Sequence, residues 1–451
     1  MARFRLSVTR PRHPTSAARH RGEMDTAIDL RRALVKYVCA SLLALVALPA
    51  FVSAANAGRQ LNPPAPWLKL YRSNSLSKKF PPGSAAERRA RMHAVAYTRF
   101  YTHKFDLGGL PLYRPKVHPS GTVRVCGNNY IGDSPLGGWW KAAFKRYQPH
   151  IHIVYDLQTA ANAISCLYED RGDIGIGHQA LFYDDLSNLR IKGYLPSSIS
   201  IVTGSYDVIG WQNSFAIIVN SHNPLTGVTM RQLDGMFGSQ RAGGWVGTRW
   251  NPRFARGPQD NIRRWGQMGL TGVWVNRPVD TYGFSLRYST ALEFSDDVLK
   301  ASDKWNGNLL AFGNYKLDGR TYLESDQIVD HVAKDPDGIG YIRYHEDLPK
   351  TVKVLAVANT AAGPYVPLTL ETEQARTYPL WGEQQMWVEA KPGKPLNRAV
   401  YEFIRFVISR QGQELVERDG KYLPLTADVA AAQLKRLNRL EAGQTVSQDL
   451  R

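Results

Sequence analysis

The apolar positions from Thr122 onward fall into two alternating patterns. Short apolar runs typical of strands occur in TVRVC (122–126), IHIVYD (151–156) and GDIGIG (172–177). Between them, apolar residues recur at helical spacing from Leu136 to Tyr147, and Thr159 is a predicted N-cap for a helix to Glu169. This alternation predicts a parallel sheet covered by helices.

A second unit with the same alternation follows. Its predicted strands are FAIIVN (215–220), residues 273–275, IGYIRY (339–344), VKVLAV (352–357) and a run that reaches QQMWVE (384–389). Its predicted helices cover residues 285–300, 325–334 and 397–410, and a shorter one ends near residue 237. The chain is therefore expected to be an α/β protein without internal repeats.

Residues 1–57 have the composition of a secretory signal peptide. A basic stretch at 31–36 precedes the uncharged run YVCASLLALVALPAFVSAANAG, which contains the small-residue cleavage site Ala55-Asn56-Ala57. Pro49 and the small, polar end of this run make a retained membrane anchor the less favoured alternative. Met24 would give a signal of ordinary length, and LRRALVK also resembles a twin-arginine signal. We expect a periplasmic or secreted protein.

Residues 58–120 are basic and rich in proline and other turn formers. We expect an extension or linker that either wraps the domain or is mobile. At most one short helix is expected in it, around residues 85–100.

Two cysteines remain beyond the signal peptide, Cys126 and Cys166. In an oxidising compartment they can form one disulfide bond. The alternative is two thiols that only pack against each other. Neither cysteine lies in a CxxC motif, which argues against a zinc or redox site.

The formal net charge is +18, and about +12 remains without the signal peptide. A basic chain favours anionic partners, although solubility alone would also account for the charge. The sequence has no GxSxG, HExxH, P-loop or helix-opening GxGxxG motif, so neither an enzyme nor a bound cofactor or metal is expected. Dispersed charge without a nucleic-acid-binding motif argues against DNA or RNA partners.

Five stretches, taken in order, resemble the substrate-binding proteins of phosphate-type ABC transporters. They are GNNYIGDSPLGGWWKAAF, TAANAISCLYEDRGDIGIG, FAIIVNSHNPLTGVTMRQLDGMFG, DPDGIGYIRY, and YPLWGEQQMWV followed by FIRFVISRQGQELVERDGKYLPL. The resemblance implies a type II, two-lobed clamshell with mixed sheets covered by helices and a hinge of two crossing segments. Lobe one is expected at 121–207 plus 358–440, and lobe two at 208–357.

The resemblance also implies an anion site at the carboxyl ends of strands, where loops and helix N-termini present N–H groups. In lobe one the family's binding loops fall on Asn128, Asn129 and Tyr130, on Thr159, and on His178. Asparagine is also a common turn residue, and Thr159 could serve only as a cap. His178 stands where phosphate binders carry an acidic residue that accepts the proton of hydrogen phosphate, which implies a relaxed or altered oxyanion preference.

In lobe two the family's loop of Arg and Ser-Gly-Thr corresponds to NRPVDTYGFSLRYS. Its candidates are Arg277, Thr281, Tyr282 and Ser285. Of these, Arg277 could bind an oxyanion through a forked guanidinium. Arg287 could instead face out of a helix.

Together these features predict a monomeric, exported solute-binding protein that captures phosphate or a related oxyanion for an inner-membrane ABC permease. The alternative is a sensor or surface protein with the same fold, because fold alone does not determine function. A hydrolase whose catalytic residues are scattered along the sequence is the least favoured interpretation. Trp139 and Trp140 lie at helical spacing and are expected in the core rather than stacked on a sugar.

Overall fold

The structure is a computed structural model that describes residues 101–177, 183–206, 208, 214–246, 249–317, 320–344 and 348–444. The predicted signal peptide, residues 58–100 and His178 lie outside the described residues. All described residues belong to one compact unit, Pro64–Arg451. Within these ranges no helix is long and apolar enough to cross a membrane.

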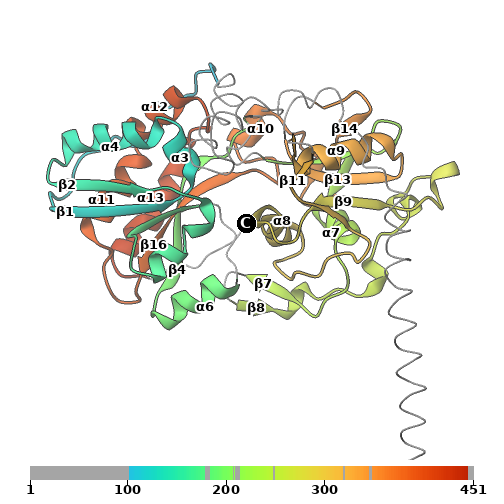
Figure 1. Ribbon diagram of the computed structural model, residues 1–451, viewed down its shortest axis with the longest axis horizontal. Helices are drawn as coiled ribbons and strands as arrows, with labels where there is room; N and C mark the ends of the chain where they lie inside the picture. The colour runs from blue at the N-terminus through green and yellow to red at the C-terminus, as the bar shows by residue number, and fades with distance from the viewer. Residues whose placement is uncertain are drawn as a thin grey trace, which may run out of the picture. The chain divides into compact units, whose positions relative to one another are not determined.

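The first sheet has the strand order β2 (Ile151–Asp156), β1 (Gly121–Gly127), β3 (Ile174–Gly177), β16 (Glu383–Ala390) and β4 (Leu195–Thr203). β1 is parallel to β2 and β3, whereas β16 is antiparallel to β3 and β4. Helices α4 (Leu136–Tyr147), α11 (Arg398–Val407) and α13 (Ala427–Glu441) pack on this sheet (Figure 1). We call this sheet and its helices the first lobe.

The second sheet has the order β10 (Leu310–Phe312), β9 (Asp280–Phe284), β13 (Gly338–Arg343), β5 (Phe215–Asn220) and β14 (Val352–Val354). β10, β9 and β13 are parallel, and β5 is antiparallel to β13 and β14. Helix α9 (Glu324–Lys334) packs on the sheet, and α7 (Met230–Phe237) and α8 (Ser289–Val298) contact each other. We call this the second lobe, and its core includes Phe294 stacked on Tyr341 at 3.8 Å between ring centroids.

The remaining elements are short. They are α3 (Asn129–Asp133), η2 (Ala160–Asn162), α5 (Ser165–Tyr168), α6 (Tyr183–Ile191), β6 (Gly227–Thr229), β7 (Gly244–Val246), β8 (Arg249–Asn251), η3 (Pro252–Phe254), η4 (Pro258–Asp260), η5 (Trp265–Met268), η6 (Gly272–Trp274), β11 (Tyr315–Leu317), β12 (Arg320–Tyr322), β15 (Ala356–Ala358), α10 (Leu370–Gln374) and α12 (Arg410–Asp419).

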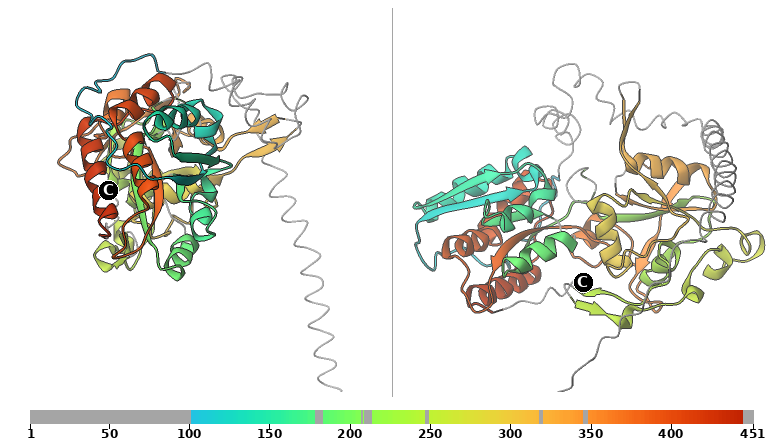
Figure 2. Two further views of the ribbon diagram at one scale, coloured as in Figure 1. Left: turned by 90° about the vertical axis from the view of Figure 1, so that its left-hand side faces the viewer. Right: turned by 60° about the horizontal axis from the view of Figure 1, so that its bottom comes forward.

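Two mixed sheets with separate cores confirm the expected α/β fold class. The chain leaves the first sheet after β4 and returns to it at β16, so two segments connect the lobes (Figure 2). The return comes later than the expected residue 358, because Leu368, Tyr378 and Leu380 are still buried in the second core. On this segment, Arg376 bonds to Ser200 of β4 at 2.7 Å and to Glu383 of β16 at 3.1 Å.

The described part of the basic extension, residues 101–120, wraps the first lobe. Leu107, Leu110 and Tyr113 are buried in its core, because burying these apolar side chains removes them from water. The Tyr113 hydroxyl also donates to the buried carboxylate of Glu402 at 2.7 Å. Of the two alternatives for the extension, wrapping holds for these residues.

The strand predicted at residues 273–275 is wrong, since Gly272–Trp274 forms a 3-10 turn. The β-branched and aromatic composition favours a strand, but Val275 has a φ of −54° and a ψ of −45°, which lie in the right-handed helical region. Trp274 packs edge-on against Trp265 instead of joining a sheet.

The two tryptophans at the start of α4 have different environments. Trp140 is fully buried and donates from Nε1 to the Gly412 carbonyl at 3.0 Å. Trp139 is half-buried, and the Arg418 guanidinium lies 4.4 Å from the centre of its ring. Trp140 is therefore the core residue of the pair.

Candidate functional site

The parallel strands of the first lobe end at one edge of their sheet. β1 ends at Gly127, β2 at Asp156 and β3 at Gly177. The residues that follow these strands therefore lie at the same edge. Asn128, Asn129 and Thr159 are among them, and His178 follows β3 directly in the sequence but lies outside the described residues.

Asn128 is buried, and its side chain is engaged by the protein. Its Oδ1 accepts from the backbone N–H of Tyr130 at 2.9 Å, which caps α3. Its Nδ2 donates to Gln384 Oε1 at 2.9 Å and to the Tyr422 hydroxyl at 3.3 Å. Asn129 is half-buried and donates to Asp133 at 2.9 Å. Asn128 thus holds the shape of the loop between β1 and α3.

An Asn128→Ala variant is expected to lower the free energy of unfolding by about 2 kcal/mol, because it removes the cap of α3 and leaves buried partners unpaired. Denaturant titration measures this loss. Asn129→Ala is the matched control and should cost less than about 1 kcal/mol, since among the described residues its side chain bonds to one partner, Asp133 on the same short helix. Equal losses for the two variants would contradict the role of Asn128.

Thr159 is exposed and caps η2, with its Oγ1 accepting from the Ala161 N–H at 3.4 Å. The single helix predicted from Thr159 to Glu169 is wrong, because η2 and α5 are separate elements. Glycines in β3 let this turn lie directly on the strand, since a Cβ at Gly175 would come within 1.7 Å of the Ala163 carbonyl oxygen. The glycines of the GDIGIG segment therefore allow the turn that begins at Thr159 to lie beside the end of β3.

In the second lobe, the loop after β9 leads into the N-terminus of α8. The Ser285 N–H donates to the Phe312 carbonyl at 2.7 Å, and the Ser285 carbonyl accepts from the Tyr288 N–H at 2.9 Å. Tyr288 occupies the N-cap of α8 but provides no side-chain cap. Among the described residues, no acceptor is recorded for the N–H groups of Ser289 and Thr290. Such a helix start carries partial positive charge and favours an anion.

Three of the four residues predicted from the second-lobe loop lie away from this helix start. Arg277 precedes β9 and pairs with Asp337 at 2.5 Å, at the amino ends of β9 and β13. The Tyr282 hydroxyl donates to Asp335 at 2.8 Å near the same end. Thr281 is buried within β9. Ser285 follows the carboxyl end of β9 and is thus the one of the four beside α8.

Several residues at this edge were missed by the sequence interpretation. They are Tyr288, Ser289 and Thr290 at the start of α8, and Glu324 at the start of α9. The Tyr-Ser-Thr sequence just before an apolar helical pattern was the available signal for α8. Arg287, which could have faced out of a helix, is exposed in the loop before α8.

Hydrogen bonds through Asn314 link the start of α8 to the start of α9. The Tyr288 hydroxyl accepts from the Asn314 N–H at 2.9 Å, and Asn314 Oδ1 accepts from the Glu324 N–H at 3.0 Å. Burial, followed by the charges of Asp133 and Glu324, raises the pKa of Tyr130 to about 12. The Glu324 carboxylate is thus near enough to influence the Tyr130 hydroxyl electrostatically. Glu324 therefore lies beside the start of α8 through Asn314 and also acts electrostatically on Tyr130.

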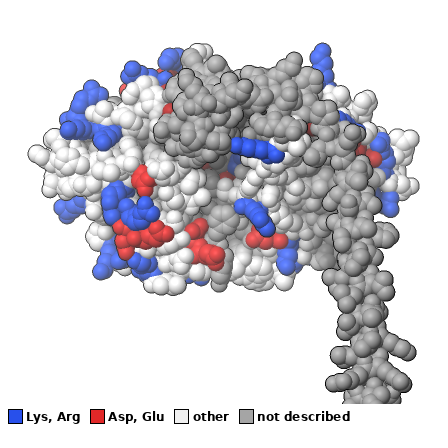
Figure 3. Space-filling model, viewed as in Figure 1, with Lys and Arg blue, Asp and Glu red and all other residues white. Residues whose placement is uncertain are grey.

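Basic and acidic side chains lie intermixed on the face shown in Figure 3. In the described part of the chain, no group of His, Cys, Asp and Glu residues has the arrangement of a metal site. Anion binding at this edge would accordingly depend on N–H groups and hydroxyls more than on a basic patch.

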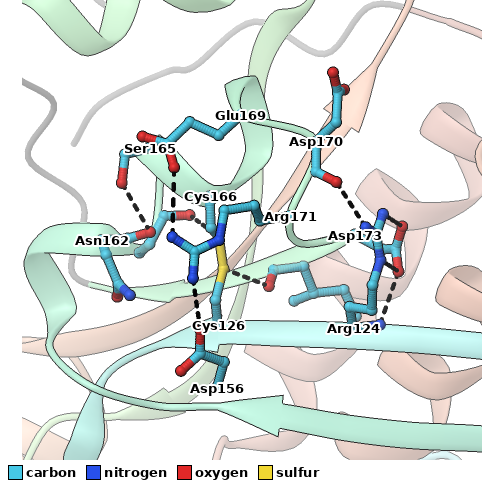
Figure 4. The surroundings of a disulfide bond; sticks show 12 residues. Arg124, Cys126, Asp156, Asn162, Ser165, Cys166, Glu169, Asp170, Arg171 and Asp173 are labelled. Atoms are coloured by element: carbon cyan, nitrogen blue, oxygen red, sulfur yellow. Dashed lines mark hydrogen bonds and ion pairs between the residues drawn. A yellow bond between two sulfur atoms is a disulfide. The ribbon is translucent and has the colours of Figure 1, made fainter.

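A disulfide bond joins Cys126 to Cys166, with 6.6 Å between their Cα atoms (Figure 4). Cys126 lies next to Gly127 at the end of β1, and Cys166 lies in α5. The bond fits against Gly172, where an added Cβ would come within 2.8 Å of both sulfur atoms. The disulfide therefore links β1, which leads into Asn128, to the segment that follows Thr159.

Comparisons with known proteins agree with the predicted family. A family model described as a PBP superfamily domain matches residues 132–411. The phosphate-binding protein PstS of Pseudomonas aeruginosa is 26% identical over 331 residues, which cover 73% of this chain and 90% of that protein.

One similar solved structure is that of a possible phosphate binding protein from Planctomyces limnophilus, at 15% identity and a TM-score of 0.41. The match covers 71% of this chain and 99% of that one. An ABC-type phosphate transport receptor from Vibrio cholerae also has 15% identity and a TM-score of 0.41, covering 67% of this chain and 99% of that one. The family model alone spans more than half of the chain, and the protein therefore belongs to the family of PBP superfamily domains.

Proposed function

We propose that the protein is an exported solute-binding protein that captures a small oxyanion, with inorganic phosphate the first candidate, for ABC-type uptake. The observation that carries this proposal is the start of α8, where N–H groups of Ser289 and Thr290 have no recorded acceptor beside the loop at Ser285. The similarity to a relative named as a phosphate-binding protein supports phosphate as the candidate. An ABC permease would be its partner.

In the first lobe, the proposed site contains the loop at Asn129 and Tyr130, the exposed Thr159 hydroxyl, and His178. In the second lobe it contains Ser285 and the first turn of α8. Arg277, Thr281 and Tyr282 are left out, because Arg277 and Tyr282 are engaged away from this edge and Thr281 is buried in its strand.

A Ser289→Asp variant separates binding from folding. A carboxylate in the first turn stabilises a helix through its dipole, so the melting temperature should stay the same or rise. The same charge would occupy and repel the proposed anion site, and phosphate affinity should fall about 100-fold, or about 3 kcal/mol. Titration calorimetry with phosphate, sulfate and a phosphonate measures the affinities.

The matched control is Ser221→Asp, an exposed serine that follows β5 at the opposite edge of the same sheet. It should leave phosphate affinity unchanged. Wild-type protein that binds none of the three anions, or a Ser289→Asp variant that binds phosphate as wild type does, would contradict the proposed site. Neighbouring permease and ATPase genes would favour transport, whereas a neighbouring histidine kinase gene would favour the sensor alternative.

A further inference from the structure

The two segments that connect the lobes are hydrogen-bonded to each other. The Gly204 N–H donates to the Gly382 carbonyl at 2.7 Å, and the Phe215 N–H donates to the Leu380 carbonyl at 3.0 Å. Any rotation of one lobe against the other must change the backbone conformation of these two segments. A group that holds this backbone in place therefore favours one arrangement of the lobes.

Tyr206 lies on the first connecting segment and packs on the second lobe. Its ring centre lies 4.8 Å from that of Tyr344, and its hydroxyl donates to the Tyr344 hydroxyl at 3.3 Å. Tyr344 directly follows β13, and its N–H donates to the Ser214 carbonyl at 3.0 Å. Both tyrosine rings are partly buried against the second core. Tyr206 is therefore held by the second lobe.

The N-terminal extension reaches Tyr206 from the first lobe. The Tyr206 N–H donates to the Tyr101 hydroxyl at 2.6 Å. Tyr101 packs against the first core, and its own N–H donates to the carbonyl of Gly420, which directly follows α12, at 2.7 Å. The hydrogen bond between Tyr101 and Tyr206 thus joins a residue held by the first lobe to a residue held by the second.

The residues that follow Tyr101 are anchored on α12. Glu417 of this helix accepts from the Phe105 N–H at 2.8 Å and pairs with Lys104 at 3.2 Å. The Lys104 side chain is exposed, so the ion pair contributes little, whereas the bond from the Phe105 backbone fixes the path of the chain. Tyr101 therefore cannot follow Tyr206 in a rotation of the second lobe unless this anchor is released.

We propose that Tyr101 is a positioning residue for anion capture. Residues 101–105, which we call the strap, hold the first connecting segment against the first lobe and so restrict rotation of the lobes. Without the hydrogen bond, this segment takes more conformations, and a bound anion must then order them at a cost in affinity. The effect on affinity rests on the proposed function, whereas the effect on the Tyr206 backbone needs no ligand.

A Tyr101→Phe variant tests the strap, because phenylalanine keeps the ring and removes the hydroxyl that accepts the Tyr206 N–H. Hydrogen exchange of the Tyr206 amide, measured without ligand, should become about 10-fold faster. Phosphate affinity, measured by titration calorimetry, should fall about 3- to 10-fold. Tyr365→Phe, at an exposed tyrosine outside the strap, removes a hydroxyl elsewhere and should change neither quantity.

A Glu417→Ala variant tests whether the anchor on α12 matters. It leaves the Tyr101 hydroxyl in place but removes the acceptor of the Phe105 N–H, so both quantities should change in the same directions as in Tyr101→Phe. Glu414→Ala, at an exposed position on the same helix, is the matched control and should behave as wild type.

Unchanged Tyr206 exchange in Tyr101→Phe would overturn the inference, whatever the protein binds. Faster exchange with unchanged phosphate affinity would show that the strap stabilises this segment without positioning the lobes for capture, which also overturns it. If wild type binds none of the three anions while Tyr206 exchange responds as expected, the proposed function fails and the restraint between the lobes stands.

Discussion

The Gly127→Ala variant is expected to lose about 4 kcal/mol or more of unfolding free energy, and oxyanion binding with it. Gly127 has a φ of 115°, a conformation that L side chains rarely adopt. An added Cβ would also lie 2.1 Å from the backbone oxygen of Ile176. The same oxygen accepts the Asn128 N–H at 2.8 Å, so the clash would push the first-lobe loop away from β3.

Gly138→Ala is the matched control for this prediction. Gly138 lies in α4 of the same lobe, and an added Cβ would meet nothing within 4 Å. Alanine at this helical position should raise the unfolding free energy by about 0.5–1 kcal/mol. Denaturant titration of both variants, with calorimetry for phosphate, checks the opposite signs. Similar midpoints for the two proteins would refute the steric argument.

Reduction of the Cys126–Cys166 disulfide should lower the free energy of unfolding by about 4 kcal/mol, because the bond closes a loop with a sequence separation of 40 residues. Phosphate affinity should weaken as well, since Cys126 adjoins the Gly127–Asn128 loop and Cys166 lies in the segment that follows Thr159. Denaturant titration with and without reductant measures the first effect, and calorimetry measures the second.

A Cys126→Ser/Cys166→Ser double variant provides the control for the disulfide. Its stability should match that of the reduced wild type and should not respond to reductant. A thiol titration of the unfolded, unreduced mature protein would contradict the disulfide if it found both cysteines free. The two side chains would then only pack together.

Local patterns in the sequence predicted many elements closely. IHIVYD and FAIIVN form β2 and β5 with the predicted bounds, and the predicted helix 325–334 begins one residue earlier as α9. β4 was missed, because the serines of LPSSISIVT resemble a loop. Ser197, Ser198 and Ser200 are nevertheless buried, in a strand paired along its length with β16.

The sequence by itself determined the α/β class, many of the individual elements and the family, because hydrophobic periodicity and capping residues act over neighbouring positions. Only the tertiary structure decided which candidates lie together. Arg277 and Ser285 are close in sequence, but β9 runs between them and carries them to opposite ends of the strand. Glu324 is far from Tyr130 in sequence, yet it influences the Tyr130 hydroxyl through space, because sheet pairing and burial join segments that no local pattern connects.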